Sequence, residues 1–160
     1  MSTLPKYRHL FAILLLTLTS TTLQALTSLT VTSSISSEAG SLEDILTQAK
    51  TIDDEISITF NVTNSNISVT QGLDVYQDYD RSITIDGSTS TTPIQLSEPS
   101  GVFNLPYLLF VFTPNVTIKN IEFNRASYGV QVSGGANDCL IENCTINNTR
   151  QRVISQNWFI

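Results

Sequence analysis

Four aspartates crowd one short stretch of this sequence and could surround a hard cation. Asp74, Asp78, Asp80 and Asp86 all lie within LDVYQDYDRSITID. Carboxylate oxygens are ligands that calcium prefers. Asp74, Asp78 and Asp80 are therefore candidate calcium ligands, and calcium is the one cofactor that the sequence suggests. The favoured alternative is a solvated acidic turn, because no glycine marks a calcium-loop bend inside the cluster.

Histidine chemistry is confined to the N-terminal segment. His9, the one histidine, lies with Lys6 and Arg8 before the apolar run of residues 10–18, and the stretch leads to the small residue Ala25. This pattern predicts a secretory signal peptide over residues 1–25. An uncleaved membrane anchor is the alternative. We expect the mature chain to have no imidazole base and no histidine-bound metal.

The charge of the mature chain argues against nucleic acid as a partner. Losing Lys6 and Arg8 with the signal peptide moves the formal charge from −6 to −8, because no acid is lost. Among the basic residues that remain, only Arg150 and Arg152 lie close together in sequence. Phosphate-binding surfaces need clustered Lys and Arg. The sequence predicts a secreted or cell-surface protein with no membrane span in the mature chain.

The elements that would position these side chains follow two different periods. Ser41 fits an N-cap with Asp44 three residues on, and apolar residues then recur at helical spacing. This predicts a short amphipathic helix over about residues 42–50. From residue 55 onward apolar and polar residues alternate, which predicts strands joined by tight turns. Residues 26–37 could begin a strand or remain a loose lead-in.

A repeat of 23 residues organises the C-terminal part of the chain. TIKNIEFN from Thr117 matches LIENCTIN from Leu140, with Asn120 on Asn143. The alternation loses one step at each asparagine, which a flat strand cannot do without turning an apolar face outward. A corner in the left-handed conformation repairs the phase, and asparagine tolerates that conformation. SITIDG resembles the same corner, with Gly87 at the asparagine position.

Strand, corner, strand, turn and strand, repeated at about 23 residues, describe one coil of a parallel β-solenoid. Successive coils lie about 4.8 Å apart, so equivalent side chains form ladders. We expect Asn120 and Asn143 to form a structural ladder, with their amides bonded along the axis. The predicted fold class is all-β. Two unrelated strand pairs in a β-sandwich are the alternative.

Three segments resemble the right-handed parallel β-helix superfamily, the fold of pectin and pectate lyases. GSLEDIL, residues 40–46, is similar to the Gly-Ser/Thr-Leu-Arg-x-Ala helix that caps the N-terminal end of these proteins. ITIDGS, residues 83–88, looks like their Thr-Ile-Asp-Gly segment, and PNVTIKNIEF and NDCLIENCTI look like their coils. The resemblance covers about residues 38–155. It implies that residues 26–160 are the N-terminal part of a right-handed parallel β-helix domain, with a capping helix at about 42–50 and coils over about 55–160.

The resemblance does not extend to the residues of catalysis. Glu43 stands where the capping motif has arginine. The calcium-binding Ile-Asp-His segment of pectate lyases has its counterpart at residues 141–143, where only Glu142 is acidic, and a second expected acid is replaced at about Tyr128. The catalytic arginine region would lie beyond Ile160. Catalytic residues therefore stay unknown, and we do not expect this chain alone to be an enzyme.

Cysteines and isolated aromatic residues each allow two interpretations. Cys139 and Cys144 could form a disulfide in a secreted protein, but five residues of extended chain exceed the roughly 7 Å limit between α carbons. We favour two buried free thiols.

Tyr107, Tyr128 and Trp158 could stack on sugar rings, although isolated aromatic residues more often fill a core or cap an open end.

A binding role is the function that the sequence favours. We expect a secreted or surface-exposed β-helix that acts as a non-catalytic binding or adhesive scaffold toward glycans or a protein partner. One alternative is the N-terminal section of a pectate-lyase-like polysaccharide lyase or glycoside hydrolase whose catalytic residues lie beyond this chain. A purely structural stalk is another.

Overall fold

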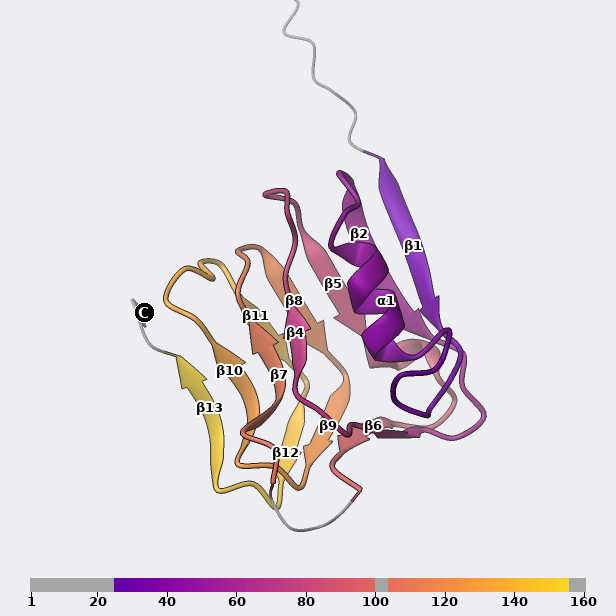
Figure 1. Ribbon diagram of the computed structural model, residues 1–160, viewed down its shortest axis with the longest axis vertical. Coiled ribbons are helices and arrows are strands. Elements are labelled where there is room, and N and C mark those ends of the chain that lie inside the picture. The colour runs from indigo at the N-terminus through magenta and orange to yellow at the C-terminus, as the bar shows by residue number, and fades with distance from the viewer. Residues whose placement is uncertain (1–24, 100–103, 156–160) are drawn as a thin grey trace, which may run out of the picture.

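The computed structural model describes residues 25–99 and 104–155, with side chains up to residue 150 (Figure 1). Most of the described chain is in short strands, with one α-helix and one 3₁₀ turn. In chain order the elements are β1 Leu26–Val31, α1 Leu42–Ala49, β2 Glu55–Phe60, β3 Asn66–Ser68, β4 Leu73–Val75, β5 Ile83–Asp86, η1 Gly87–Thr89, β6 Ile94–Ser97, β7 Tyr107–Val111, β8 Val116–Lys119, β9 Ile121–Asn124, β10 Tyr128–Val132, β11 Leu140–Glu142, β12 Thr145–Asn147 and β13 Gln151–Ser155.

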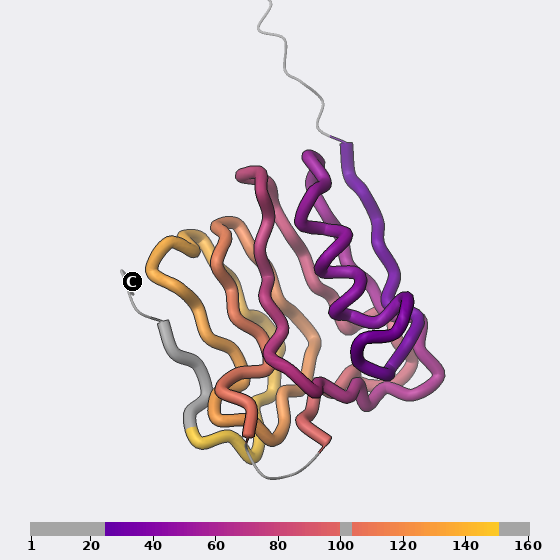
Figure 2. The backbone as a smooth tube through the Cα atoms, in the orientation of Figure 1, coloured from indigo at the N-terminus to yellow at the C-terminus, as the bar shows by residue number. Residues whose placement is uncertain are grey.

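The strands form three sheets in which every pair is parallel. The strand orders are β1-β2-β5-β8-β11, β12-β9-β6-β3 and β13-β10-β7-β4. Each consecutive set of three strands from β2 onward gives one strand to each sheet, and we call such a set a layer. The layers β2–β3–β4, β5–β6–β7, β8–β9–β10 and β11–β12–β13 follow one another, and the backbone visits the sheets in the same order each time (Figure 2).

The predicted 23-residue repeat is confirmed as the register of parallel pairing. Thr117 of β8 lies opposite Leu140 of β11, and Phe123 of β9 lies opposite Ile146 of β12. The same offset joins β10 to β13. Residues 116–124 and 139–147 therefore lie in adjacent layers of the same sheets. The alternative of two unrelated strand pairs in a sandwich is wrong for these segments.

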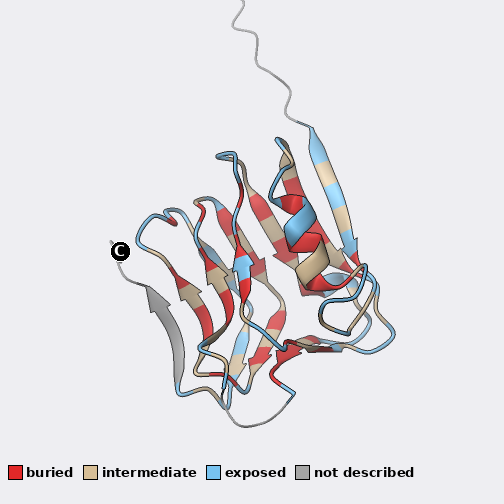
Figure 3. Cartoon of the chain, in the orientation of Figure 1, coloured by how far each residue is buried: buried red, intermediate tan, exposed pale blue. Residues whose placement is uncertain are grey.

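Buried residues recur along the strands of successive layers (Figure 3). Their side chains form one continuous apolar core. In β8 and β9, Ile118 and Phe123 are completely buried, at 0% exposure. Their partners in the last layer, Ile141 and Ile146, are only partly buried. A layer that is covered by the next one therefore has fully buried apolar side chains, and the equivalent side chains of the last described layer are more exposed.

The predicted helix is present as α1 and ends at Ala49, one residue earlier than expected. Its N-cap is Ser41, whose Oγ accepts a hydrogen bond from the Asp44 backbone N–H at 3.2 Å. The Asp44 carboxylate accepts from the backbone N–H of Gly40 at 2.7 Å, one residue before the position that a capping box would use. The helix packs on β1 and β4 (Figure 1). Its buried stripe is Leu42, Ile45, Leu46 and Ala49.

Residues 26–31 form a strand rather than a loose lead-in. β1 pairs in parallel with β2 along its whole length, with Leu29 opposite Ile58. The predicted signal peptide, residues 1–25, lies outside the described residues apart from Ala25. Within the described part of the chain, no helix is long and apolar enough to cross a membrane.

Gly87 occupies the predicted position but for a different reason. Because Asp86 pairs with Lys119, Gly87 lies beside Asn120 of the next layer. Asn120 has a φ of 58°, whereas Gly40 is the only described glycine with a positive φ. A Cβ at Gly87 would lie 2.2 Å from the carbonyl oxygen of Asn120. The expected left-handed corner at Gly87 is therefore wrong, and the glycine is needed because two backbones approach closely.

Candidate functional site

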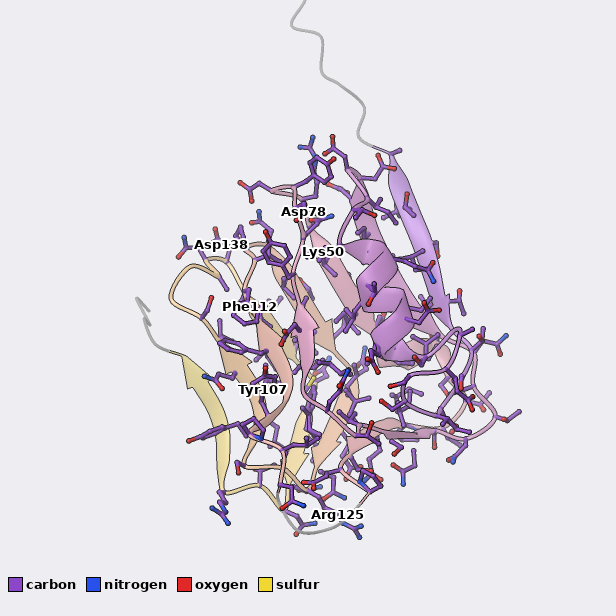
Figure 4. All side chains as sticks on the ribbon, in the orientation of Figure 1. Lys50, Asp78, Tyr107, Phe112, Arg125 and Asp138 are labelled. Carbon is purple, nitrogen blue, oxygen red and sulfur yellow. The ribbon has the colours of Figure 1, made fainter. Side chains whose placement is uncertain are left out.

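Three aromatic side chains follow one another along β7, on the outer face of the sheet β13-β10-β7-β4. Phe112 is exposed, and Tyr107 and Phe110 are partly buried. Phe110 and Phe112 alternate with the buried Leu109 and Val111 and therefore face outward. The centroids of the two phenylalanine rings are 3.9 Å apart, with the rings tilted by 33°. The Tyr107 ring meets Phe110 edge-on at 5.1 Å. We call Tyr107, Phe110 and Phe112 the aromatic row; Figure 4 labels its first and last members.

A groove of about 300 Å³ lies next to this row, between α1 and β4. Glu43, Thr47 and Lys50 line its helix side, and Asp74 and Tyr76 line its strand side. This volume is at the lower end of the range for small-molecule sites. The groove therefore suits one small ligand or one unit of a longer ligand.

On the helix side of the groove, the Glu43 carboxylate is hydrogen-bonded to three side chains, whereas the Lys50 ammonium has no ion pair with a described residue. Glu43 accepts hydrogen bonds from the hydroxyls of Ser36 and Ser37, at 3.2 and 2.8 Å, and from the amide of Gln71. Its carboxylate is therefore held in place. Lys50 forms no ion pair with a described residue. Its ammonium lies 5.0 Å from the centroid of the Tyr76 ring, a favourable cation–π distance.

Asp74 connects the groove to the aromatic row. It lies opposite Phe110 in the register of β4 and β7, and its Oδ1 accepts a hydrogen bond from the Tyr107 hydroxyl at 3.1 Å. Burial, and then the bond to Asp74 and its charge, raise the pKa of Tyr107 above its usual 10.0. The hydroxyl therefore stays protonated at neutral pH. A Cβ at Gly72 would lie 2.3 Å from the Tyr107 ring, so this glycine leaves the ring its space.

The three candidate calcium ligands, Asp74, Asp78 and Asp80, lie on two different segments and have different contacts. Asp74 is on β4, whereas Asp78 and Asp80 lie in the turn that follows it. Asp80 accepts a hydrogen bond from the Asn115 amide at 3.4 Å, and the Asp78 backbone N–H donates to the carbonyl oxygen of Lys50 at 3.0 Å. Over residues 25–99 and 104–155, no three His, Cys, Asp or Glu side chains are grouped so as to hold a metal ion. Calcium binding stays a prediction of the sequence alone.

Asp86, the fourth aspartate of the cluster, has a structural role. It accepts hydrogen bonds from the Asn120 amide and the Ser88 backbone N–H, each at 2.9 Å, and pairs with the Lys119 ammonium at 3.3 Å. Partial burial alone would raise the pKa of this carboxyl. The hydrogen bonds from Asn120, Ser88 and Lys119 outweigh burial and lower the pKa from 3.8 to about 2. Asp86 therefore joins two layers as a carboxylate.

Asn120 and Asn143 have the backbone conformation that the predicted ladder requires, but their side chains do not form the predicted bond to each other. Asn120 and Asn143 have φ values of 58° and 51°, as the predicted corners require. The Asn120 amide donates to Asp86 in the preceding layer, however, rather than bonding to Asn143. An amide-to-amide bond between layers occurs further along the chain, where Asn148 donates to Asn124 at 2.9 Å.

Both cysteines are free thiols, as the sequence favoured, and both are partly buried. Burial raises the pKa of the Cys139 thiol to about 11. Burial also raises the pKa of Cys144, against the opposing effect of hydrogen bonds from nearby backbone N–H groups. The reactive form of cysteine is the thiolate. These thiols are therefore poor nucleophiles at neutral pH and do not add chemistry to the site.

Sequence reasoning found one member of the aromatic row and missed the others. Tyr107 was a candidate for sugar stacking, as was Tyr128, which lies opposite it in β10. Trp158 lies outside the described residues. The missed residues were Phe110 and Phe112, which occupy alternate positions at the end of YLLFVF. The run is apolar throughout, so it gave no indication of which positions face outward.

The comparisons with known proteins leave this site to be interpreted from its own geometry. No protein-family model, curated protein or solved structure matches the chain. The site offers flat rings, a fixed carboxylate, an unpaired ammonium and a small groove on one face. These groups are suited to binding a polyhydroxylated or polar ligand.

Proposed function

We propose that this protein is a right-handed parallel β-helix, secreted or displayed at a cell surface, that binds glycans through the aromatic row without catalysing a reaction. The observation that carries the proposal is the row itself. Phe112 is 39% exposed although it is a large apolar residue, and its ring lies against that of Phe110 at the end of β7. Exposed aromatic rings in a row on a rigid face form a platform for sugar rings, whose apolar faces pack on them.

The order of the strands supports the β-helix part of the proposal. Four successive layers each send one strand to the same three sheets, and all pairs are parallel. Connections between parallel strands of one sheet are right-handed in about 98% of cases. The proposed right-handed coiling therefore agrees with the general handedness of connections between parallel strands.

The N-terminal sequence supports the extracellular part of the proposal. A basic flank, a short apolar run and a small residue at Ala25 are typical of a cleaved secretory signal. Glycans are abundant ligands at cell surfaces, and an acidic chain of this kind has little affinity for nucleic acid. A glycan partner therefore agrees with both the composition and the site.

A glycan-binding assay with two aromatic variants tests the proposal. The protein produced from the complete sequence should bind to at least one member of a panel of immobilised polysaccharides, and Phe112→Ala should weaken that binding about tenfold. Tyr79→Ala is the matched control, since Tyr79 is exposed to a similar extent, 43%, but lies in the turn after β4. Loss of binding in the control alone, or binding to no glycan, would contradict the proposal.

A polysaccharide lyase is the alternative from a different class. It predicts unsaturated product when the protein is incubated with polygalacturonate and calcium. Absorbance from the new double bond would replace the binding proposal with a catalytic one. A purely structural stalk predicts neither binding nor product.

A further inference from the structure

The groove between α1 and β4 differs from the aromatic row in its chemistry. The row offers rings, whereas the groove offers one open carboxylate oxygen and one ammonium at its two sides. Oδ1 of Asp74 accepts a hydrogen bond from the Tyr107 hydroxyl, and Oδ2 has no hydrogen-bond partner among the described residues. Lys50 is free of ion pairs with described residues and rests over Tyr76.

We infer that the groove binds a single neutral pyranose unit, the end of a glycan chain that continues over the aromatic row. This inference rests on the proposed function and assigns its substrate class. Vicinal hydroxyl groups of a pyranose can each donate and accept. One hydroxyl donates to Asp74 Oδ2 on the strand side of the groove, and another accepts from the Lys50 ammonium on the helix side.

The connection between groove and row depends on Tyr107. Its hydroxyl holds Asp74, and its ring contacts Phe110. A ligand that fills the groove therefore meets the row at Tyr107 without leaving the face of the sheet. The absence of a side chain at Gly72 is required for this arrangement, because a Cβ there would lie 2.3 Å from the Tyr107 ring.

Charge selects a neutral sugar over a uronate. The groove contains two carboxylates, Glu43 and Asp74, and one ammonium, Lys50. Glu43 is held by Ser36, Ser37 and Gln71 and cannot turn away. The chain as a whole has a formal charge of −6. A polyuronate would bring further negative charge to a surface that is already negative, whereas hydroxyl groups use both signs in the groove.

The size of the groove agrees with one sugar unit. Its volume of about 300 Å³ is at the lower end of the range for small-molecule sites, which suits one sugar unit better than a long segment of chain. Further units of the chain then lie over the aromatic row, which meets the groove at Tyr107.

Calorimetric titration of the full protein with neutral oligosaccharides and with oligogalacturonate tests the inference. We expect the neutral ligands to bind more tightly, with less than a twofold change in affinity between 50 and 500 mM salt, because screening acts on charged ligands. Asp74→Asn and Lys50→Met should each weaken neutral-glycan binding about tenfold. Asp138→Asn makes the same chemical change at an exposed aspartate in the turn before β11 and should leave binding unchanged.

The outcomes separate the two proposals. If Phe112→Ala weakens binding but the groove variants do not, the groove assignment is wrong and the glycan-binding function stands. Tighter, salt-sensitive binding of oligogalacturonate would likewise overturn the neutral-sugar assignment alone. If the unaltered protein binds no glycan, both proposals fail. Far-ultraviolet circular dichroism of each variant establishes that its fold is intact.

Discussion

Asn143 shows at the scale of one residue how a layer turns its corner. Its φ of 51° is in the left-handed region, which costs most residues about 1–2 kcal/mol and glycine almost nothing. Asn120 meets the same demand one layer earlier and also bonds to Asp86. The asparagines at these corners are therefore explained by backbone conformation first and by side-chain bonding second.

Replacing Asn143 separates these two contributions. Asn143→Ala should lower the free energy of unfolding by about 1 kcal/mol, because alanine cannot adopt the left-handed conformation without strain. Asn143→Gly should stay close to the unaltered protein, since glycine is free of that strain. Urea denaturation followed by circular dichroism measures both. An equal loss in the two variants would show that the amide, rather than the backbone, is what the corner needs.

Asp86 predicts a pH dependence of stability with a definite sign. Its pKa is lowered to about 2 in the folded protein, against roughly 3.9 in an unfolded chain. A lowered carboxyl pKa stabilises the fold above the unfolded value, and that contribution is lost as the pH falls through about 2. Asp86→Asn should therefore cost about 2 kcal/mol at pH 6 and progressively less between pH 4 and pH 2.

Chemical denaturation at a series of pH values checks this prediction. Asp138→Asn is the matched control, because that side chain is exposed and the change removes the same charge. Its stability should follow that of the unaltered protein at every pH. A cost for Asp86→Asn that is constant from pH 6 to pH 2 would contradict the role assigned to the carboxylate.

At the scale of elements, local patterns predicted more than the connections between layers. The helical stripe and N-cap predicted α1 to within one residue, and the 23-residue repeat predicted the register of the last two layers. The register of the earlier layers was not predicted, because the number of residues between paired strands varies there. Ile83 pairs with Val116 at an offset of 33 residues, whereas Tyr107 pairs with Tyr128 at 21. A repeat with excursions of different lengths keeps its register in space but loses it in the sequence.

Gly87 illustrates what a single sequence does not reveal about contacts between elements. Its alignment with Asn120 was correct, yet the reason for glycine is the carbonyl oxygen of the next layer, 2.2 Å from where a Cβ would lie. Glycine has several physical uses, including positive φ and close backbone approach. Only the structure distinguishes between them.

Alanine substitution at two glycines tests the close approach between layers. Gly87→Ala should destabilise the protein by about 1–3 kcal/mol or prevent folding, because backbone on both sides must move to admit a methyl group. Gly135→Ala is the control, since nothing lies within 4 Å of a Cβ at that position. Thermal denaturation compares the two. Equal melting temperatures for both variants would refute the close packing of η1 against the corner at Asn120.

At the scale of the whole molecule, the candidate site joins side chains that are far apart in the sequence. The parallel pairing of β4 with β7 brings Asp74 close to Tyr107. Lys50 follows α1, which packs on β4; Figure 4 labels Lys50 and Tyr107. Alternation identifies which residues of a strand share a face, but not which strands are neighbours. The groove was therefore beyond prediction until the sheet order was known.

The stacking also predicts a gradient of stability along the molecule. Each layer is covered by the next, and the last described layer has partly buried apolar residues where its predecessor has fully buried ones. Ile118 pairs with Ile141, and Phe123 with Ile146, so the same positions can be compared in two layers. In repeat proteins stability is a sum of contributions from neighbouring units, and segments with fewer buried apolar contacts open more readily.

We therefore expect backbone amides of β11 and β12 to exchange hydrogen at least about tenfold faster than those of β8 and β9. Exchange followed by mass spectrometry of peptides covering residues 116–124 and 139–147 measures this in one experiment, since the two segments have matched positions and register. Repeating it over a range of protein concentrations separates an open layer from one that pairs with another molecule through its strand edges. Equal protection of the two segments at every concentration would contradict the gradient, because it would mean that β11 and β12 are held as firmly as β8 and β9 although their apolar side chains are less buried.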